Sequence, residues 1–523
     1  MISISTRSLA YRIGTRDILT DVTFSLEEGD RLAVVGVNGS GKSTLLRMLC
    51  GEYTPDEGEV YIAKEKVIGM LHQDDAFNVL SLDSANTIVD ETVLGQIYAI
   101  FPDLCRAEMK LADLQRQLDE APSDDTALLS RLSSEYESVN TRYIDGGGLH
   151  YKSRCRSILK DLGFGEEMFD MPVSKCSGGQ RTRLALARLL SREPDILILD
   201  EPTNHLDTET MEWLESHLAS YNPKKTIILV SHDRLFLDRV TNKTLDIEHT
   251  VGKLYKCGYS QYVIEKEAYR REWEKKYEIQ QKEIARLEMI VEKYKNTPTK
   301  VAMTRSKLKA IEHMEKIESP DRFDTATFHA NFKPNRETGK EVLRVTNLEI
   351  GYDKVLSKVN MEQFRKQRIG IIGGNGLGKS TFLKTLVGQI PPLGGEATFG
   401  YQVDIGYFDQ QMAQYNSNKT VLDDFWDEYP TLDRTEVRSS LGAFMFSQEE
   451  VFKKKVRLAL CKIFKTKPNF LILDEPTNHM DIVGKESLEA MLRDFPGSVL
   501  FVSHDRYFIK QIADALLVFE DGE

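Results

Sequence analysis

Short apolar runs recur along the chain and alternate with stretches whose apolar residues have helical spacing. The longest runs, such as residues 196–199 and 226–230, have the length of a strand. Strands that alternate with helices are typical of an α/β fold with a largely parallel sheet. None of the runs approaches the ~18 apolar residues that a membrane-spanning helix needs. The pattern therefore predicts α/β domains and no membrane span.

The chain contains one set of motifs twice. Residues 36–44 (GVNGSGKST) recur as residues 373–381 (GGNGLGKST), residues 195–207 (DILILDEPTNHLD) recur as residues 469–481 (NFLILDEPTNHMD), and residues 229–234 (LVSHDR) recur as residues 501–506 (FVSHDR). The motifs are too far apart for a solenoid of short repeats, so the pattern indicates duplication of a whole domain. We expect a first domain over residues 1–257 and a second over residues 341–523.

The first copy holds an insertion that the second lacks. Lys42 and Asp200 are 158 positions apart, whereas their counterparts Lys379 and Asp474 are 95 positions apart. Most of the additional residues fall near residues 100–145. Helical spacing with charged outer faces covers residues 106–118 and 127–139. We therefore expect a small helical arm inserted in the first domain.

Residues 258–340, between the two copies, have a different character. Large apolar side chains recur there three, four or seven positions apart, on one face of a long helix: Tyr262, Tyr269, Trp273, Tyr277, Ile284, Leu287, Val291 and Tyr294. Pro298 interrupts the pattern, and a second helix is expected over residues 300–318. The two helices predict a hairpin linker of coiled-coil type, and residues 319–340, which have no period, predict an extended strap.

Basic side chains gather around the turn of this hairpin, and no acidic residue lies between positions 293 and 309. The six are Lys293, Lys295, Lys300, Arg305, Lys307 and Lys309. The whole chain is acidic, with 81 Asp and Glu against 69 Lys and Arg and a formal net charge of −12. This balance excludes a basic coat that binds nucleic acid over the whole surface. It leaves a local contact with phosphate-rich RNA at the turn, or a merely solvated turn.

The cysteines and the first residues indicate a compartment. Six cysteines form no Cys-x-x-Cys pair, which argues against a zinc site, an iron–sulfur cluster or a disulfide framework. The first residues lack the apolar core of a secretion signal. The hydrophobic share of 41% and the charged share of 29% are ordinary for a folded globular protein. We expect a cytoplasmic protein.

Each copy of the GxxxxGK[ST] motif predicts a loop that cradles phosphates between a strand and a helix. Glycines let backbone N–H groups approach phosphate oxygens, and the helix N-terminus adds a partial positive charge. The lysine meets the β- and γ-phosphates, and the following serine ligates Mg²⁺. The candidate nucleotide-binding residues are Gly36, Asn38, Gly39, Gly41, Lys42, Ser43 and Thr44 in the first loop and Gly373, Asn375, Gly376, Gly378, Lys379, Ser380 and Thr381 in the second.

An apolar strand that ends in Asp-Glu follows each loop, and a strand that ends in Ser-His follows that. The candidates are Asp200 and Asp474 for the Mg²⁺ shell, Glu201 and Glu475 for a general base or water-orienting group, and His232 and His504 for contact with the γ-phosphate. Alone, a strand-end Asp-Glu is usually a solvated loop and a histidine there is usually structural. The paired phosphate loops reverse that balance.

In this order the motifs resemble those of the ABC ATPases: Walker A, Walker B with its glutamate, and the histidine switch. Residues 175–180 (KCSGGQ) look like the ABC signature loop, with Ser177, Gly178, Gly179 and Gln180 as its nucleotide-facing residues. Gln73 and Gln410 match the Q-loop position, which places them by resemblance in the Mg²⁺ shell. Tyr11 and Tyr352 match the aromatic residue that stacks on adenine, or are ordinary strand aromatics.

More narrowly, the chain resembles the ABC-F family of twin-cassette proteins, for which the DEPTNH[LM]D motif at residues 200–207 and 474–481 is characteristic. The resemblance covers essentially the whole chain. It implies two ABC-type P-loop ATPase domains, a helical arm and a helical linker, ATP and Mg²⁺ as ligands, and a monomer whose cassettes pair within one chain. It also implies ribosome binding, with the linker tip near rRNA and peptidyl-tRNA, in translation regulation or antibiotic protection.

The second copy departs from the family at its signature loop. Aligning residues 181–187 with residues 455–461 places residues 451–454 (VFKK) opposite residues 177–180. The pattern indicates a deletion of about eight residues, or else a sequence or gene-model error or a pseudogene-like lesion. ABC cassettes close head to tail, so the first Walker A loop would face the missing signature. We expect the first site to bind ATP and turn over poorly.

Three other ABC-type functions compete with action on the ribosome. The energising subunit of a membrane transporter needs no basic hairpin, and no membrane domain is fused here. A DNA-repair ABC ATPase would show zinc-binding cysteine pairs, and an iron–sulfur ribosome-recycling relative would show a cysteine cluster. The transporter subunit is the main alternative.

Overall fold

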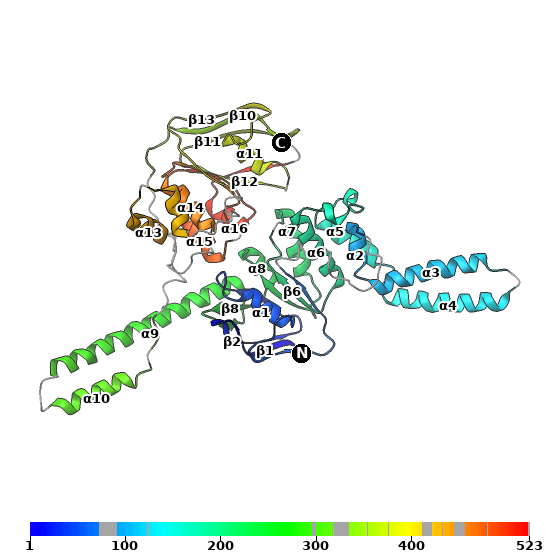
Figure 1. Ribbon diagram of the computed structural model, residues 1–523, viewed down its shortest axis with the longest axis horizontal. Coiled ribbons are helices and arrows are strands. Elements are labelled where there is room, and N and C mark those ends of the chain that lie inside the picture. Colours follow the sequence, from blue (N-terminus) through cyan, green and yellow to red (C-terminus); the bar gives the residue numbers. More distant parts are fainter. Residues whose placement is uncertain are drawn as a thin grey trace.

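A computed structural model of the protein describes residues 1–72, 91–122, 125–204, 206–294, 300–315, 317, 319, 334–352, 354–374, 376–409, 421–430, 432–443, 455–478 and 480–520. Two α/β cassettes carry two helical projections that extend in opposite directions (Figure 1). The predicted α/β fold with two repeated domains is confirmed.

The first cassette is built on one mixed sheet of nine strands within the described residues, in the order β4-β1-β2-β9-β8-β3-β7-β6-β5. The strands are β1 (Ile2–Ile13), β2 (Arg16–Glu27), β3 (Arg31–Val35), β4 (Glu57–Ile62), β5 (Ile68–Leu71), β6 (Ile196–Asp200), β7 (Thr226–Val230), β8 (Lys243–Glu248) and β9 (Val251–Tyr255). Strands β8, β3, β7, β6 and β5 are parallel. The phosphate loop directly follows β3, and the Asp-Glu pair begins at the last residue of β6. Both therefore lie at the carboxyl ends of the parallel strands.

Helices cover both faces of this sheet and form the arm. They are α1 (Lys42–Leu49), α2 (Val93–Tyr98), α3 (Pro102–Glu120), α4 (Thr126–Asp145), α5 (Tyr151–Asp161), α6 (Gly178–Arg192), α7 (Thr208–Ala219) and α8 (Arg234–Val240), with 3-10 turns at Glu166–Met168 and Val173–Lys175. Helices α3 and α4 form an antiparallel pair that projects from the cassette (Figure 1). Both are longer than the helices the sequence predicts, because apolar side chains at their cassette ends, Leu104 of α3 and Tyr143 of α4, pack on the core of the first cassette.

The linker hairpin consists of α9 (Tyr259–Tyr294) and α10 (Val301–Glu312). The second helix ends six residues before the predicted boundary at residue 318. Gln280 of α9 explains the difference, because its side-chain amide donates to the Glu315 carbonyl oxygen at 2.7 Å and accepts from the Ile317 N–H at 2.7 Å. These backbone groups therefore bond to α9 instead of extending α10.

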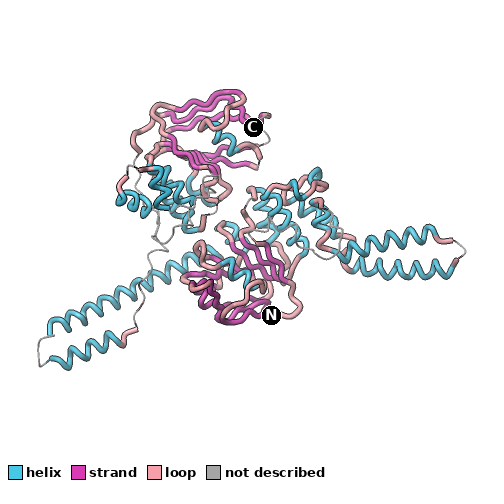
Figure 2. The backbone as a smooth tube through the Cα atoms, viewed as in Figure 1, coloured by secondary structure: helices cyan, strands magenta, loops and turns pink. Residues whose placement is uncertain are grey.

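The second cassette repeats the layers with a divided sheet, visible in magenta in Figure 2. Its described strands form a three-stranded sheet, β11-β10-β13, and a five-stranded sheet, β14-β15-β16-β12-β17. The elements are β10 (Glu341–Gly351), β11 (Val355–Phe364), β12 (Arg368–Gly373), α11 (Lys379–Leu386), β13 (Gly394–Phe399), β14 (Ile405–Phe408), α12 (Val421–Glu428), α13 (Arg434–Ala443), α14 (Lys455–Lys465), β15 (Phe470–Asp474), α15 (Ile482–Asp494), β16 (Ser498–Val502), α16 (Arg506–Ile512) and β17 (Ala515–Phe519).

Alternate residues of the central strands fill two separate cores. In β6, Leu197 and Leu199 pack towards α5–α8, whereas Ile196 and Ile198 pack towards α1. Strand β15 divides in the same way, with Leu471 in one core and Ile472 in the other. Because a strand exposes successive side chains on opposite faces, a continuous apolar run is what a sheet covered on both sides requires.

Candidate ATP-binding and hydrolysis sites

The two phosphate loops have nearly the same backbone. Gly41 precedes α1 with φ of 97°, and Gly378 precedes α11 with φ of 94°. A Cβ on Gly41 would lie 3.0 Å from side-chain atoms of Ile18 and Leu19. Since this region is unfavourable for residues with a Cβ, glycine is required where each loop turns into its helix.

The loop lysines lie folded over their own loops. Lys42 Nζ donates to the carbonyl oxygens of Gly36 (2.8 Å) and Val37 (3.0 Å), and Lys379 Nζ donates to those of Gly373 (2.7 Å) and Gly374 (2.7 Å). Burial lowers the pKa of both lysines. Each loop thus holds a buried cation at its centre, where a phosphate chain would neutralise it.

A serine and an aspartate meet beside each loop. Ser380 Oγ donates to Asp474 Oδ1 at 3.0 Å, and Ser43 bonds to Asp200 in the same way. Burial raises the pKa of Asp474 to about 6 and also raises that of Asp200. Such an oxygen pair fits Mg²⁺, which takes one or two protein oxygens and completes its shell with water and phosphate. The described residues include no cluster of three or more His, Cys, Asp or Glu side chains suited to another metal.

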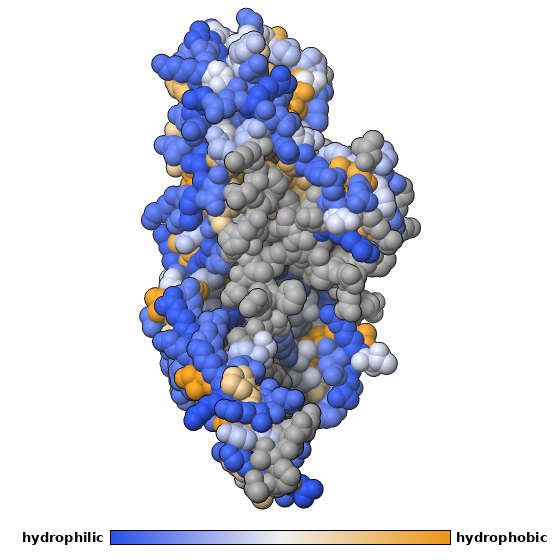
Figure 3. Space-filling view, turned by 90° about the vertical axis from the view of Figure 1, so that its left-hand side faces the viewer, coloured by the Kyte–Doolittle hydropathy of each residue, from blue (hydrophilic) through white to orange (hydrophobic). Residues whose placement is uncertain are grey.

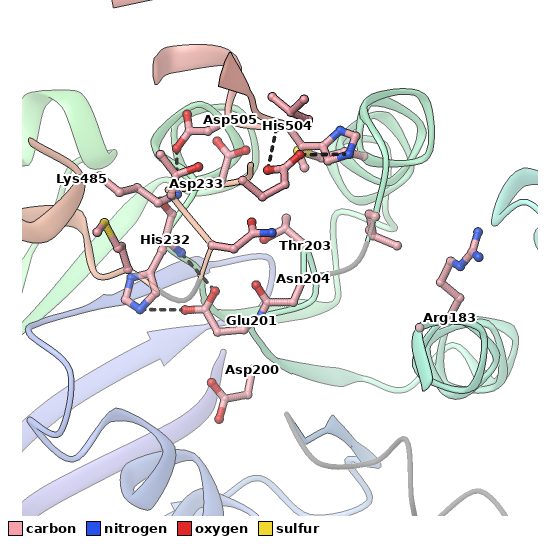
Figure 4. Close-up of a pocket in the computed structure, with 18 of the residues that line it drawn as sticks. Arg183, Asp200, Glu201, Thr203, Asn204, His232, Asp233, Lys485, His504 and Asp505 are labelled. Carbon is pink, nitrogen blue, oxygen red and sulfur yellow. Dashed lines mark hydrogen bonds and ion pairs between the residues drawn. The ribbon is translucent and has the colours of Figure 1, made fainter. Parts of the chain in front are cut away.

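The glutamates next to these aspartates adopt a left-handed backbone, with φ of 52° at Glu201 and 48° at Glu475. Each glutamate accepts a hydrogen bond from the backbone N–H of a histidine. The His232 N–H donates to Glu201 Oε2 at 3.2 Å, and the His504 N–H donates to Glu475 Oε2 at 3.3 Å. Each histidine Nε2 also lies 3.4 Å from the other carboxylate oxygen of its glutamate. The first of these pairs is drawn in Figure 4.

The electrostatics of these two pairs suit proton transfer. Burial, reinforced by the adjacent aspartate, raises the pKa of Glu201 to about 7 and that of Glu475 to about 8. Burial and the nearby loop lysine lower the pKa of His232 to about 3 and that of His504 to about 4. The histidines are therefore neutral at pH 7, and their contacts with the glutamates are not ion pairs. A carboxylate with a pKa near neutrality can accept a proton from an attacking water.

A cavity of about 960 Å³ joins the two cassettes around these groups. Ser177 and Gly179 of the first cassette line it together with Gly376 and Lys379 of the second. Ser177 begins α6 with a capping box, in which Ser177 Oγ accepts from the Gln180 N–H and the Gln180 side chain accepts from the Ser177 N–H. The capping box fixes the start of α6 in a cavity that residues of both phosphate loops line, including Lys42 of the first and Lys379 of the second.

Comparisons with known proteins match both cassettes and the linker. The family model described as "ABC transporter" matches residues 19–204 and 356–478, and a second model with the same description matches residues 245–330. The Bacillus subtilis protein YdiF is 39% identical over 99% of this chain and 80% of its own length. The Arabidopsis thaliana ABC transporter F family member 5 is 34% identical over 97% of this chain and 73% of its own. The chain belongs to the ABC-F family.

A solved structure shares the fold. The crystal structure of the complex of archaeal ribosomal stalk protein aP1 and archaeal ribosome recycling factor aABCE1 matches with a TM-score of 0.57 at 18% identity, covering 98% of this chain and 88% of that chain. As an ABC-F protein the chain carries ATP-binding cassettes of the ATP-hydrolysing type. None of the helices in the described ranges is long and apolar enough to cross a membrane.

Some predicted site residues of this ABC-F chain lie outside the described residues. These are Gln73, Asn375, Gln410 and Lys295, together with residues 451–454, which align with the signature of the first cassette. Of the two tyrosines matched to the adenine position, Tyr352 lines the cavity. Tyr11 stacks on Tyr53, with ring centroids 5.5 Å apart, and is not among the lining residues. Both assignments remain predictions.

The sequence analysis missed the residues that join the two cassettes. Arg234 of α8 pairs with Glu489 and Glu486 of α15, and Arg506 of α16 pairs with Glu215 and Glu212 of α7. Asp481 Oδ2 also accepts from the Asn38 N–H of the first phosphate loop at 3.2 Å. A signal was present, because both histidines are followed by Asp-Arg in the repeated SHDR motif.

Proposed function

We propose that this ABC-F protein is a cytoplasmic, monomeric ATPase that uses ATP-driven closure of its cassettes to act on the ribosome, in translation regulation or in protection from antibiotics. The observation that carries the proposal is the linker hairpin, which holds a basic tip far from both ATP sites. A transporter subunit has no use for such an element.

The root of the hairpin is fixed to the first cassette by ion pairs. Lys266 Nζ of α9 lies 2.6 Å from Asp246 Oδ2 and 3.2 Å from Glu248 Oε2, and Arg270 Nη2 donates to Glu248 Oε1 at 2.6 Å. The acidic partners belong to β8, which is the neighbour of β3. The 36 residues of α9 extend about 54 Å at ~1.5 Å per residue.

The tip presents cations and an aromatic ring together. The side chains of Lys293, Arg305 and Lys309 are exposed, and Lys300 Nζ lies 3.7 Å from the ring centroid of Tyr294. Figure 3, which faces the side where the hairpin projects, shows a mostly hydrophilic described surface with isolated hydrophobic residues. Lysine and arginine contacts to phosphate supply salt-dependent affinity for RNA, and aromatic rings stack on unpaired bases.

The named function of one structural neighbour also supports action on the ribosome. The archaeal protein with the same fold is a ribosome recycling factor, solved with a ribosomal stalk protein. At 18% identity this neighbour supports the fold directly and the partner only by analogy.

Sedimentation through a sucrose cushion tests the proposal. Glu201→Gln combined with Glu475→Gln keeps the ATP-binding groups and removes both candidate bases, so the protein with ATP should stay closed and pellet with ribosomes more than wild type. Pelleting with membranes instead would favour the transporter subunit. Cell-free translation with and without a ribosome-targeting antibiotic then separates regulation from protection.

Charge reversal at the tip tests how the contact is made. Lys293→Glu, Lys300→Glu and Arg305→Glu together should weaken ribosome binding and reduce the slope of log affinity against log salt by about two to three, or roughly one unit per lost phosphate contact. The matched control reverses Lys275, Lys276 and Lys282 in the middle of α9. Equal losses from both triple variants would contradict a contact at the tip.

We also propose that the two ATP sites are unequal and that hydrolysis depends on the second. Both phosphate loops line the cavity together with Ser177 and Gly179. In the head-to-tail closure that the family resemblance implies, the intact signature serves the second loop, whereas the segment that aligns with it in the second cassette, residues 451–454, reads VFKK. Losing such N–H and hydroxyl donors to a developing oxyanion typically removes ~2–4 kcal/mol of transition-state stabilisation. Inserting an eight-residue segment that contains SGGE before Lys455 should raise turnover at the first site, and no gain would contradict a deletion.

A further inference from the structure

Helices α7 and α15 begin alike but differ four residues later. Asp207 and Asp481 cap the two helices, each accepting from an N–H three residues on at 2.9 Å. The fourth residue after the cap is Met211 in the first cassette and Lys485 in the second. Both line the shared cavity. A long apolar side chain in one cassette thus corresponds to a cation in the other.

Lys485 crosses from the second cassette to the first ATP site. Its Nζ donates to the His232 carbonyl oxygen of the first cassette at 3.0 Å and to Asp505 Oδ2 of its own cassette at 2.7 Å. The residue is 7% exposed. In Figure 4 its side chain extends towards the His232 strand end, with the Asp505 contact dashed.

His232 connects Lys485 to the candidate base Glu201 through its backbone. The N–H of His232 donates to Glu201 Oε2, while the carbonyl oxygen of the same residue accepts from Lys485. Both polar groups of the His232 backbone are therefore held, one by Glu201 in cis and one by Lys485 in trans. In a site that excludes water, fixing the neighbours of a base within a fraction of an ångström is what orients it for attack.

We propose that Lys485 is a positioning residue of the first ATP site, donated by the second cassette, which orients the Glu201–His232 pair only when the cassettes are closed. At the aligned position of the first cassette, the Met211 side chain has no N–H or O–H group that could donate to His504 of the second site. The positive charge of Lys485 also opposes the rise in the pKa of Glu201 that burial causes. The proposal rests on the assignment of Glu201 as the base and is independent of the ribosome.

Single-turnover hydrolysis with enzyme in excess of radiolabelled ATP tests this role even if the first site is slow. In the Glu475→Gln background, which isolates the first site, Lys485→Met should lower the rate constant about tenfold and leave the ATP concentration for half-saturation within about twofold. Lys485→Arg, which keeps a donor, should recover most of the rate. Lys510→Met, an exposed lysine on the adjacent α16, is the matched control for loss of charge.

The same substitution in the Glu201→Gln background, which isolates the second site, supplies the comparison. The loss caused by Lys485→Met should be several-fold larger at the first site than at the second. Equal losses in the two backgrounds would make Lys485 an ordinary interface residue and overturn the proposal. If Glu475→Gln is no faster than the Glu201→Gln/Glu475→Gln double variant, Glu201 is not a base and the proposal also fails.

Amide hydrogen exchange gives a readout apart from activity when it is measured with ATP in the Glu201→Gln/Glu475→Gln variant, which is expected to stay closed. Lys485→Met should speed exchange in a peptide that covers residues 230–234 severalfold, because the His232 carbonyl loses its partner across the interface, and Lys485→Arg should not. Unchanged exchange there would contradict the proposal. Ribosome pelleting, which tests the proposed function, does not enter this experiment.

Discussion

The two cassettes differ most in their outer strands and least at the phosphate sites. In the first, β9 pairs with β8 and with β2 and so joins the parallel region to the outer hairpin. In the described part of the second, β17 and β11 belong to separate sheets. Yet the histidine-to-glutamate contacts agree within 0.1 Å, at 3.2 Å and 3.3 Å. The difference teaches that the reaction geometry depends on the central parallel strands, and that asymmetry enters through what the opposite cassette supplies.

The largest expected difference between the cassettes is the effect of removing the candidate base from each. Glu475→Gln should lower steady-state phosphate release with ribosomes by about 10²–10³-fold, since general-base catalysis contributes roughly 10²–10⁴-fold. Glu201→Gln should change it less than about threefold if, as proposed, hydrolysis depends on the second site. Both variants should still bind a fluorescent ATP analogue. Equal losses would mean that the second cassette finds another signature or that the sites are tightly coupled.

The interface arginines give the next largest effect. Arg234→Ala should lower the free energy of unfolding by about 3–5 kcal/mol, because it leaves the buried Glu489 carboxylate without its partner. Arg506→Ala should cost less, since the Arg506 side chain is 16% exposed against 7% for Arg234. Urea unfolding of the two variants checks the order. Arg239, which is 59% exposed and pairs with Glu215 from within the first cassette, is the control.

The raised pKa values of Glu201 and Glu475 predict that each glutamate lowers the stability of the fold as the pH rises. Glu201 and Glu475 have pKa values of about 7 and 8 in the fold, above their ordinary value of 4.5. Folding therefore opposes their ionisation, and they cost stability increasingly as the pH rises from 4.5 to 8. Each Gln variant should raise the nucleotide-free Tm at pH 8, Glu475→Gln more than Glu201→Gln, and the gain should vanish near pH 4. A gain that does not depend on pH would contradict these values.

The smallest expected difference is in the stability cost of removing Asp207, which caps a helix, and Asp481, which caps a helix and also contacts the first phosphate loop. Asp207→Ala should cost about 1 kcal/mol, the usual value of a lost N-cap. Asp481→Ala loses the same cap and also the bond from the Asn38 N–H, so it should cost about 0.5–1.5 kcal/mol more, the usual contribution of one hydrogen bond. Chemical unfolding measures both, and equal costs would mean that the contact with the first phosphate loop adds nothing.

Much of each phosphate site could be predicted because its parts are local. The turn from strand to helix needs a glycine with positive φ, and that glycine lies within the GxxxxGK[ST] motif itself. The motif therefore predicts the turn without any information from distant residues. The continuous apolar runs of β6 and β15 likewise predict strands that are buried on both faces.

The interface could not be predicted in the same way. Arg234 and Glu489 are 255 positions apart, and their pairing depends on how two separately folded units face each other. Lys485 reads in the sequence as one more basic residue in a helix. The early end of α10 depends on hydrogen bonds from Gln280 of α9, and the spacing of apolar residues within α10 does not reveal such a contact.

The rooting of α9 on β8 has a mechanical consequence. Its ion pairs end one strand away from β3, which leads directly into the first phosphate loop. The arm beyond Arg270 runs to Tyr294 and is about 36 Å long at ~1.5 Å per residue, so a rotation of about 10° at its base would displace its far end by about 6 Å. A small rotation beside the first phosphate loop would therefore be enlarged at the basic residues of the tip, because they lie at the far end of a stiff helix that is anchored next to that loop.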